Sequence, residues 1–272
     1  MTEAEPSLNT LLHFALDAAW QAGRVTLAHF QTGLMAERKA DNSPVTIADR
    51  EAEQTLRRLI TERWPDHSII GEEYGHTAGK DGDHGYTWII DPIDGTKSFI
   101  SGVPIYAVLL ALVKDNEPVL GVMHFPGLNE TVYAARGRGC HWNGRPARVS
   151  NVSKLSDAVL LTSDLNNFSQ YNRQATFQRL IDATYFQRTW GDAYGYALVA
   201  TGRAEVMLDP AMAVWDCGPL QVILEEAGGT FTDWTGKPTI FGGESIATNG
   251  LLFNEVMAIV RGDQIFDRDD AL

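Results

Sequence analysis

The sequence has few cysteines, few basic residues and no long apolar run. Cys140 and Cys217 lie far apart and outside any CxxC spacing, which argues against a disulfide framework or a zinc knuckle and favours reduced thiols. The 22 Lys and Arg against 35 Asp and Glu give a net charge of −13, which argues against nucleic acid or an anionic membrane as the main partner. No apolar stretch approaches the ~20 residues that span a bilayer, and the N-terminal residues are acidic. These absences predict a cytoplasmic protein.

Apolar residues at helical and strand spacing are abundant. With 272 residues, 44% of them hydrophobic, the chain suffices for one large domain or for two closely packed halves. Helices are predicted from residue 8 to about residue 32 and from about residue 45 to residue 63, because Pro65 disfavours continuation of the second helix. A strand is predicted at 68–70, and a glycine-rich loop follows over 75–85. The next strand begins at Trp88, and a meander of three strands follows at 107–113, 119–125 and 131–135.

Beyond about residue 155 the pattern changes to short strands that alternate with helices. Strands are predicted at 159–162, 186–188 and 204–208, and helices at 174–183, at 194–200 and after Asp216. We therefore expect an N-terminal α+β half over residues 1–155 and a C-terminal α/β half over residues 156–272.

The segment from Trp88 to Thr96 is the most informative part of the chain. An apolar strand ends there in Asp91 and Asp94, and the rigid Pro92 lies between them. Gly95 lets the backbone approach a ligand, and Thr96 adds a hydroxyl beside the acids. An ordinary polar turn is the alternative, because Asp, Pro and Gly are frequent turn residues.

Two other acids also interrupt apolar elements. Glu72, followed by Glu73, ends a predicted strand, and Asp216 follows Trp215 at the start of a predicted helix. Taken singly, Glu72 could belong to a solvated turn and Asp216 could be a helix N-cap. If the acids meet, each pair at ~4 Å repels by about 4 kcal/mol in a partly screened site, so that a cluster implies a cation. Oxygen ligands favour a hard cation, with Mg²⁺ as the first candidate and Mn²⁺ as the second.

These blocks resemble, in their order, the signature blocks of the inositol monophosphatase superfamily. The segment from Asp41 to Asp49 is similar to an early block of the same family, so the resemblance extends over most of the chain. It implies a layered αβαβα sandwich with an antiparallel sheet in the N-terminal half and a mixed sheet in the C-terminal half. It also implies a homodimer and a small-molecule phosphate monoester as the substrate.

The resemblance implies roles for individual residues. It makes Glu72, Asp91, Asp94, Asp216 and the carbonyl group of Ile93 the ligands of two or three Mg²⁺ ions. Glu72, Thr96 and Asp49 become the catalytic residues that position the attacking water, and the N–H groups of Gly95 and Thr96 reach the phosphate. For Asp49, an interaction with the helix dipole alone is the alternative. The implied reaction is direct attack on the phosphate by a metal-activated water, without a covalent phosphoenzyme.

These blocks recognise only phosphate, so other segments must determine the alcohol part of the substrate. Lys97-Ser98 and the segment over 188–205 resemble the histidinol-phosphatase branch of the family, whereas inositol phosphatases more often have Thr-Asn at the first of these places. Histidinol phosphate carries a cationic amine and an imidazole, which Asp192 and Asp209 could receive. Alternatives remain: Asp209-Pro210 could open a turn, and Lys97 could be merely solvated.

The sequence leaves several activities open. Histidinol-phosphate phosphatase is the leading hypothesis, and hydrolysis of inositol 1-phosphate or of 3′-phosphoadenosine 5′-phosphate is the alternative within the family. A non-catalytic regulator that binds a phosphometabolite is the alternative of another class. Trp190 and Tyr194 could flank an imidazole ring, although aromatic residues beside a helix are more often in the core. His124, on an apolar strand, is expected in the core or at an interface rather than as a catalyst.

Overall fold

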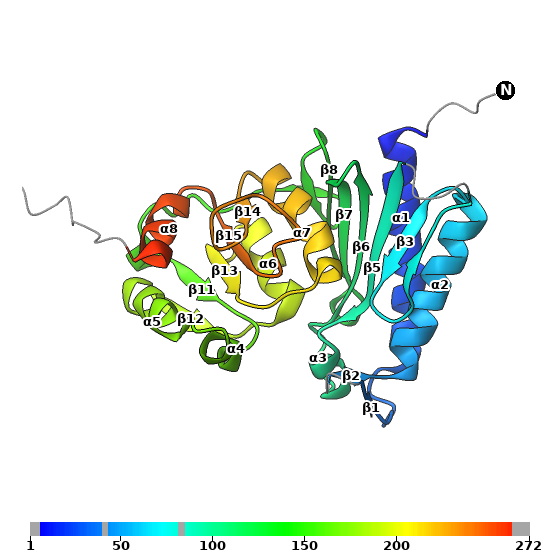
Figure 1. Ribbon diagram of the computed structural model, residues 1–272, viewed down its shortest axis with the longest axis horizontal. Helices are drawn as coiled ribbons and strands as arrows, with labels where there is room; N and C mark the ends of the chain where they lie inside the picture. The colour runs from blue at the N-terminus through cyan, green and yellow to red at the C-terminus, as the bar shows by residue number, and fades with distance from the viewer. Residues whose placement is uncertain (1–5, 40–42, 81–84, 263–272) are drawn as a thin grey trace, which may run out of the picture.

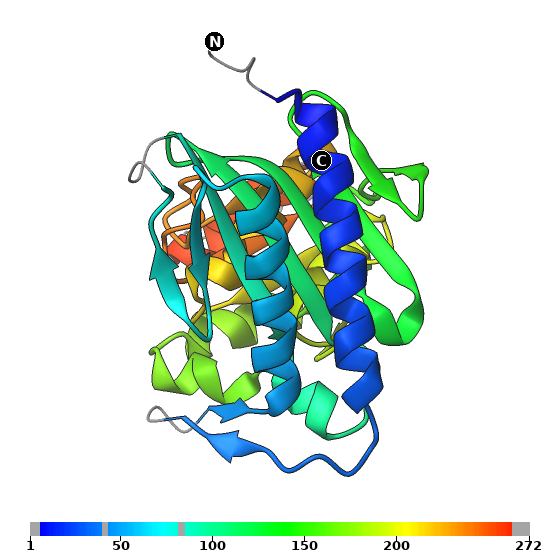
Figure 2. The ribbon, with the colours of Figure 1, turned by 90° about the vertical axis from the view of Figure 1, so that its right-hand side faces the viewer.

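The computed structural model describes residues 6–39, 43–80 and 85–262, and its first layer consists of two long helices (Figure 1). These helices, α1 (Leu8–His29) and α2 (Ile47–Arg63), lie side by side across one face of a large sheet (Figure 2). The strands of this eight-stranded sheet are, in spatial order, β10 (Arg145–Ala147), β9 (Cys140–Trp142), β8 (Glu130–Ala135), β7 (Glu117–Phe125), β6 (Ala107–Lys114), β5 (Tyr86–Asp94), β3 (Ser68–Gly71) and β4 (Gly75–Thr77).

All neighbouring strands of this sheet are antiparallel except β3 and β5, which are parallel. A separate two-stranded ladder follows α1 and precedes α2 in the sequence; its strands are β1 (Glu37–Arg38) and β2 (Pro44–Val45). The short helices are α3 (Thr96–Ile100), η1 (Pro126–Leu128) and η2 (Leu155–Asp157). None of the helices in the described ranges has the length and apolar character that crossing a bilayer requires.

A second, five-stranded sheet is formed by the later part of the chain. Its spatial order is β12 (Phe186–Arg188), β11 (Val159–Leu161), β13 (Val206–Asp209), β15 (Ser245–Thr248) and β14 (Thr230–Thr232), with β11 parallel to both of its neighbours and the other pairs antiparallel. Two helices, α6 (Asp192–Ala200) and α7 (Val214–Glu226), lie between the sheets. Three others cover the outer face: α4 (Leu165–Gln170), α5 (Gln174–Ala183) and α8 (Phe253–Arg261).

The order of layers is therefore helix, sheet, helix, sheet, helix, which confirms the predicted αβαβα sandwich. Separate apolar cores fill the interfaces: Leu11, Leu56 and Trp88 are fully buried between the first two layers, and Tyr196 and Leu220 lie between the two sheets. Burial of apolar surface at these interfaces supplies the main favourable free energy of folding. The division into halves near residue 155 stays a prediction about folding units.

Helix α7 approaches the large sheet closely at Gly121. A Cβ atom on this glycine would lie 2.5 Å from the carbonyl oxygen of Pro219, so that only glycine lets the backbone of α7 rest on β7. This contact sets the depth of the helix that carries Asp216. A backbone position on a strand therefore contributes to the geometry of the candidate site.

Most predicted elements are present, with three differences. Helix α1 ends at His29 rather than near Thr32, because the chain turns extended at Phe30 and Gln31 adopts a φ of 58°. The segment predicted as a loop over 75–85 instead begins with β4, which completes the edge of the large sheet; residues 81–84 lie outside the described residues. Asp216 is not the N-cap of its helix: Ala213 is, and Asp216 lies three residues further on.

Candidate active site

Asp91 and Asp94 lie at the carboxyl end of β5, where a bulge interrupts its pairing with β6. Asp91 is opposite Leu109 and Asp94 is opposite Ala107, so that β5 contains one residue more than its partner between these pairs. In a regular strand, side chains three residues apart point to opposite faces, and one extra residue brings them to the same face. The bulge around Pro92 therefore directs both carboxylates to one place. Asp91 Oδ1 also accepts a hydrogen bond of 3.0 Å from the N–H of Ile93.

Asp216 completes a cluster with these two acids. Ligand oxygens of Asp91, Asp94 and Asp216 lie within 4.8 Å of one another. Asp216 is in the first turn of α7 and accepts a hydrogen bond of 2.7 Å from the N–H of Ala213, which fixes its side chain at the helix start. The structure thus brings together three of the five ligands that the sequence predicts, from elements far apart in the chain.

The electrostatics of the cluster suit a divalent cation. Burial raises the pKa of Asp91 and of Asp94 well above the ordinary range, and nearby acids raise both further. Burial also raises the pKa of Asp216 to about 7, although the Ala213 N–H opposes this shift. Three clustered carboxylates, of which Asp91 and Asp94 are buried and Asp216 is half-buried, repel one another without a cation, whereas oxygen donors at this spacing match the ligand preference of Mg²⁺. The residues present therefore fit the metal that the sequence implies.

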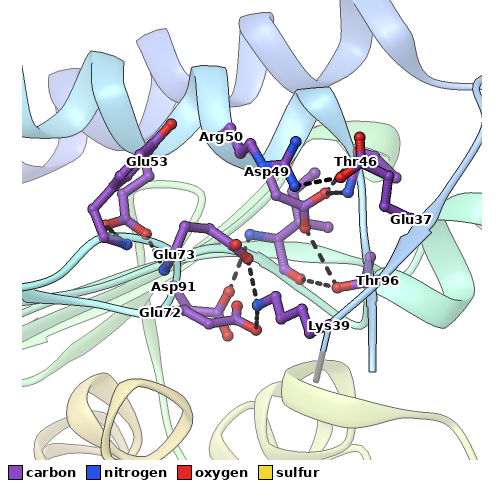
Figure 3. A network of polar contacts seen from close by, with 12 residues as sticks. Glu37, Lys39, Thr46, Asp49, Arg50, Glu53, Glu72, Glu73, Asp91 and Thr96 are labelled. Atoms are coloured by element: carbon purple, nitrogen blue, oxygen red, sulfur yellow. Dashed lines mark hydrogen bonds and ion pairs between the residues drawn. The ribbon is translucent and has the colours of Figure 1, made fainter. Parts of the chain in front are cut away.

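Glu72 lies beside the cluster and points to a lysine (Figure 3). It follows β3, and its N–H donates a hydrogen bond of 3.2 Å to the carbonyl of Ile90, one residue before Asp91. Lys39 Nζ contacts Glu72 Oε1 at 2.8 Å and Glu73 Oε1 at 2.6 Å. Although burial opposes it, these two ion pairs raise the pKa of Lys39, so that the lysine stays charged. Lys39 was not predicted from the sequence, because one lysine in a polar segment forms no recognisable pattern.

Asp49 and Thr96 form the other side of the site. Asp49 is fully buried at the start of α2, and its Oδ2 accepts hydrogen bonds from the N–H and the hydroxyl of Thr46 at 2.8 and 2.6 Å. The Thr96 hydroxyl lies 3.4 Å from Asp49 Oδ1 and 3.1 Å from the carbonyl oxygen of Ile93. Burial raises the pKa of Asp49, while the Thr46 hydrogen bonds oppose this shift. The structure therefore brings together Asp49, Thr96 and Ile93, as the sequence predicts. Asp41 and Asn42 of the same early block lie outside the described residues.

Gly95 stands where the two parts of the chain meet. Its φ of 78° is left-handed, and a Cβ atom there would lie 2.7 Å from Asp192 Oδ2. Next to it, Asp94 Oδ2 accepts a hydrogen bond of 2.7 Å from the N–H of Ala193 at the start of α6. Glycine is therefore required twice, for its conformation and for the space that Asp192 occupies. Asp192 thus lies against the turn that is predicted to bind phosphate.

A cavity of about 120 Å³ extends from the acid cluster into the second part of the chain. Its lining includes the acids and polar groups Asp94, Lys97, Ser163, Asp164, Asn167, Asp192, Tyr196, Asp209 and Asp216. Asp209 ends β13 and does not open a turn by itself. It is buried, and its two oxygens accept hydrogen bonds from Thr162 Oγ1, from the N–H and hydroxyl of Ser163, and from the hydroxyl of Tyr196, at 2.9 to 3.1 Å. A role for Asp209 in substrate binding stays a prediction.

Three other expected positions are now placed. Lys97 is largely exposed and forms an ion pair of 3.4 Å with Asp164, which the sequence analysis did not single out. Tyr194 packs edge-on against Phe125, with ring centroids 5.2 Å apart, and belongs to the core between the sheets. His124 is buried and contacts the hydroxyl of Thr131, in agreement with a core position.

Comparison with known proteins gives the family of this chain and agrees with the fold. The model of the inositol monophosphatase family matches residues 7–262, and this chain belongs to that family. It is 42% identical to a histidinol-phosphatase of Chlorobaculum parvum over 93% of this chain and 98% of that protein. It is 38% identical to a histidinol-phosphatase of Mycobacterium tuberculosis over 90% and 96%. Among solved structures, the extragenic suppressor protein suhB from Bartonella henselae superimposes with a TM-score of 0.86 at 27% identity, over 93% of this chain and 98% of the other.

Proposed function

We propose that this protein is a Mg²⁺-dependent phosphate-monoester hydrolase whose substrate is histidinol phosphate. The observation that carries the proposal is the cluster of Asp91, Asp94 and Asp216 at the head of a cavity with further acids on its wall. The metal cluster supports phosphoryl chemistry, and the acidic wall supports a substrate with a cationic group. The names of two relatives, both histidinol-phosphatases, support the same substrate.

Asp91, Asp94, Asp216 and Glu72 would hold two or three divalent ions, with the carbonyl of Ile93 as a further ligand. Each of the three clustered acids uses one oxygen to accept a backbone hydrogen bond, from Ile93, Ala193 or Ala213, and a carboxylate has a second oxygen to offer a metal. When bound, the ions neutralise the acids, polarise the phosphoryl oxygens and increase the acidity of a coordinated water. Mg²⁺ is preferred because it binds to a few carboxylates and completes its coordination with waters and substrate oxygens. Mn²⁺ is the expected substitute.

Thr96 and Asp49 would orient the attacking water. The hydroxyl hydrogen of Thr96 is directed to acceptors, the carbonyl of Ile93 or Asp49 Oδ1, so its lone pairs can accept a hydrogen bond from water. Asp49 keeps its place because Thr46 donates two hydrogen bonds to its other oxygen. Glu72 would act beside them as the group that takes the proton of this water. The three side chains thus fix the direction from which the water approaches phosphorus.

The turn at Gly95 would bind the phosphoryl group. The first N–H groups of a helix have no acceptor within the helix, and α3 begins directly after Gly95. Without a Cβ atom, Gly95 lets its own N–H and that of Thr96 approach the phosphoryl oxygens. Asp192 and Asp209 would then line the part of the cavity that receives the alcohol part of the substrate.

Phosphate release tests the proposal directly. Purified protein is offered histidinol phosphate, inositol 1-phosphate and 3′-phosphoadenosine 5′-phosphate, with Mg²⁺ and in parallel with Mn²⁺. We expect the highest kcat/KM with histidinol phosphate. A higher kcat/KM for one of the other two esters would identify that ester as the substrate instead of histidinol phosphate. No turnover of any of the three would favour the non-catalytic regulator.

The metal cluster is tested by Asp94→Asn. The change keeps the volume of the side chain and its acceptor for the Ala193 N–H, but it removes a charged ligand. We expect kcat to fall by at least about a hundredfold, the scale for a lost metal-centred interaction, while the circular dichroism spectrum is retained. Wild-type turnover by this variant would exclude Asp94 as a ligand.

We also propose that the protein is a homodimer, which the resemblance to the family supports, and that it is cytoplasmic, which the few cysteines and the lack of a long apolar run favour. The chain has a mass of 30.0 kDa, so light scattering separates a monomer from a particle of twice that mass. A monomer at micromolar concentration would contradict this part of the proposal.

A further inference from the structure

The cavity beside the acid cluster shares three lining side chains with a wider groove, and these side chains mark the junction of the two. Lys97, Asp164 and Asn167 line both the small cavity and a groove of about 770 Å³ that runs along the β1–β2 ladder and α4. Lys97 comes from α3 and Asp164 precedes α4, so the junction lies between the two parts of the chain. A substrate that enters from the groove passes this pair before it reaches the acid cluster.

The carboxylate of Asp164 is held in one orientation. It is the N-cap of α4, and its Oδ1 accepts a hydrogen bond of 2.9 Å from the N–H of Asn166. Its Oδ2 is therefore directed to the junction, where it contacts Lys97 Nζ at 3.4 Å. The Asn166 N–H and Lys97 lower the pKa of Asp164, so the group is charged at neutral pH.

The ammonium group of Lys97 is easily displaced from this carboxylate. Its side chain is 76% exposed and that of Asp164 is 33% exposed, and the contact is long. Exposed pairs of this kind contribute little to stability, so another ammonium group can replace the lysine at small cost. The carboxylate of Asp164, which lines the predicted active site, thus already pairs with an ammonium group, that of the Lys97 side chain.

The other acids of the cavity are less suited to this role. Both oxygens of Asp209 are occupied by hydrogen bonds from Thr162, Ser163 and Tyr196. Asp192 lies against Gly95, near the expected phosphate, and burial raises its pKa. Asp164 lines the same small cavity as Asp94 and Asp216, so an ammonium group a few bonds away from the phosphate can face it.

We propose that Asp164 binds the ammonium group of the substrate, and that Lys97 occupies this place until the substrate displaces it. This inference rests on the proposed function, because it requires a phosphate monoester that carries an amine. Asp164 is then a specificity-determining residue: it separates amine-bearing monoesters from neutral ones, whereas the acid cluster acts on the phosphate of either. No bond is formed or broken in this step, and one ion pair replaces another.

The test compares histidinol phosphate with its amine-free analogue, the phosphate ester of 3-(imidazol-4-yl)propanol. For Asp164→Asn, we expect the ratio of kcat/KM for the two substrates to fall about tenfold, through KM of the amine-bearing substrate, since hydrogen bonds to charged groups contribute on this scale. Asparagine is as good an N-cap as aspartate, so α4 is retained. Lys97→Met should raise the same ratio about twofold, because an exposed competitor is removed. In the double variant the lysine change should have no further effect on the ratio.

Glu37→Gln is the matched control. Glu37 lines the outer groove and pairs with Arg50 rather than with a residue of the junction. Its substitution by glutamine removes the same negative charge as Asp164→Asn. We expect it to leave the ratio unchanged. An unchanged ratio in Asp164→Asn, with active wild-type protein, would overturn this inference alone. Wild-type protein that hydrolyses only other monoesters would overturn the proposed function and this inference together.

Discussion

Glu53 is a buried carboxylate that holds the turn of Glu72 in place (Figure 3). It is fully buried on α2, and it accepts hydrogen bonds from the N–H of Glu73 at 2.7 Å, from the N–H of Tyr74 at 3.2 Å and from Arg57 Nε at 2.7 Å. A Cβ atom on Gly71 would lie 2.1 Å from Glu53 Oε1, so the turn is pressed directly onto this carboxylate. We predict that Glu53→Gln lowers both stability and metal affinity.

The structure gives the scale of the effect. Glutamine has the same shape, but its NH₂ group would face a donor where an oxygen now accepts, and the charge opposite Arg57 is lost. The side chain of Arg57 is only 15% exposed, and removal of one partner of a buried ion pair costs about 3 to 5 kcal/mol. Arg57 keeps its hydrogen bonds to the Gly75 carbonyl and to Thr77, so we expect the lower end, about 3 kcal/mol.

The assay is urea unfolding of the metal-free protein, followed by Mg²⁺ titration of the folded protein in a calorimeter. We expect the free energy of unfolding to fall by about 3 kcal/mol and the Mg²⁺ affinity by about tenfold, since residues that orient metal ligands have effects of this size. The control is Glu62→Gln on the same helix, where the pair with Arg58 is exposed and is worth at most about 0.5 kcal/mol. If both variants lost the same small amount, the reasoning about Glu53 would be refuted.

The remaining predictions concern pH and the phosphate turn. Without metal, the pKa of Asp216 is raised to about 7, so the folded protein binds more protons than the unfolded protein between about pH 4 and 7. The free energy of unfolding should therefore fall as the pH rises through this range, and urea unfolding at several pH values measures this change. Because Mg²⁺ must displace that proton, calorimetry should show its affinity falling roughly tenfold from pH 8 to pH 6; a constant affinity would contradict the raised pKa. Gly95→Ala should reduce kcat at least about tenfold, since a left-handed alanine costs 1 to 2 kcal/mol and its Cβ atom would collide with Asp192. Turnover close to wild type would show that the turn at Gly95 can move without loss of function.

Local patterns predicted the fold well, because they are set by residues close in the sequence. The apolar periodicity of α1, α2 and the meander β6–β8 gave the helices and strands of the first part nearly to their ends. The sequence did not predict β4, since residues 75–77 are exposed and gain their strand conformation only by pairing with the edge strand β3. The end of α1 was also missed, because the left-handed Gln31 carries no glycine or proline signal.

The members of the acid cluster were predictable for a related reason. Asp91, Asp94 and Asp216 each interrupt an apolar element, which is a local anomaly visible in the sequence. The residues that surround them lack such an anomaly: Glu53 occupies a helical position next to Arg57, and Asp164 is an ordinary N-cap. Their importance arises from contacts across many residues, between Glu53 and the turn 20 residues later and between Asp164 and Lys97, 67 residues earlier. Only the packing of the layers brings these groups together.

The partners of each carboxylate separate the acids that are saturated by fixed hydrogen-bond donors from the acids that pair with a lysine. Glu53 and Asp209 are saturated by donors on rigid backbone or buried side chains, so neither can exchange a partner without a large loss of stability. Glu72 and Asp164 instead form ion pairs with lysines, Lys39 and Lys97. A metal ion at Glu72 and a substrate amine at Asp164 would each displace an ammonium group that already neutralises the carboxylate. The net charge of the site then changes less on binding than the number of its acids suggests. The cost of removing water from these charges is smaller for the same reason.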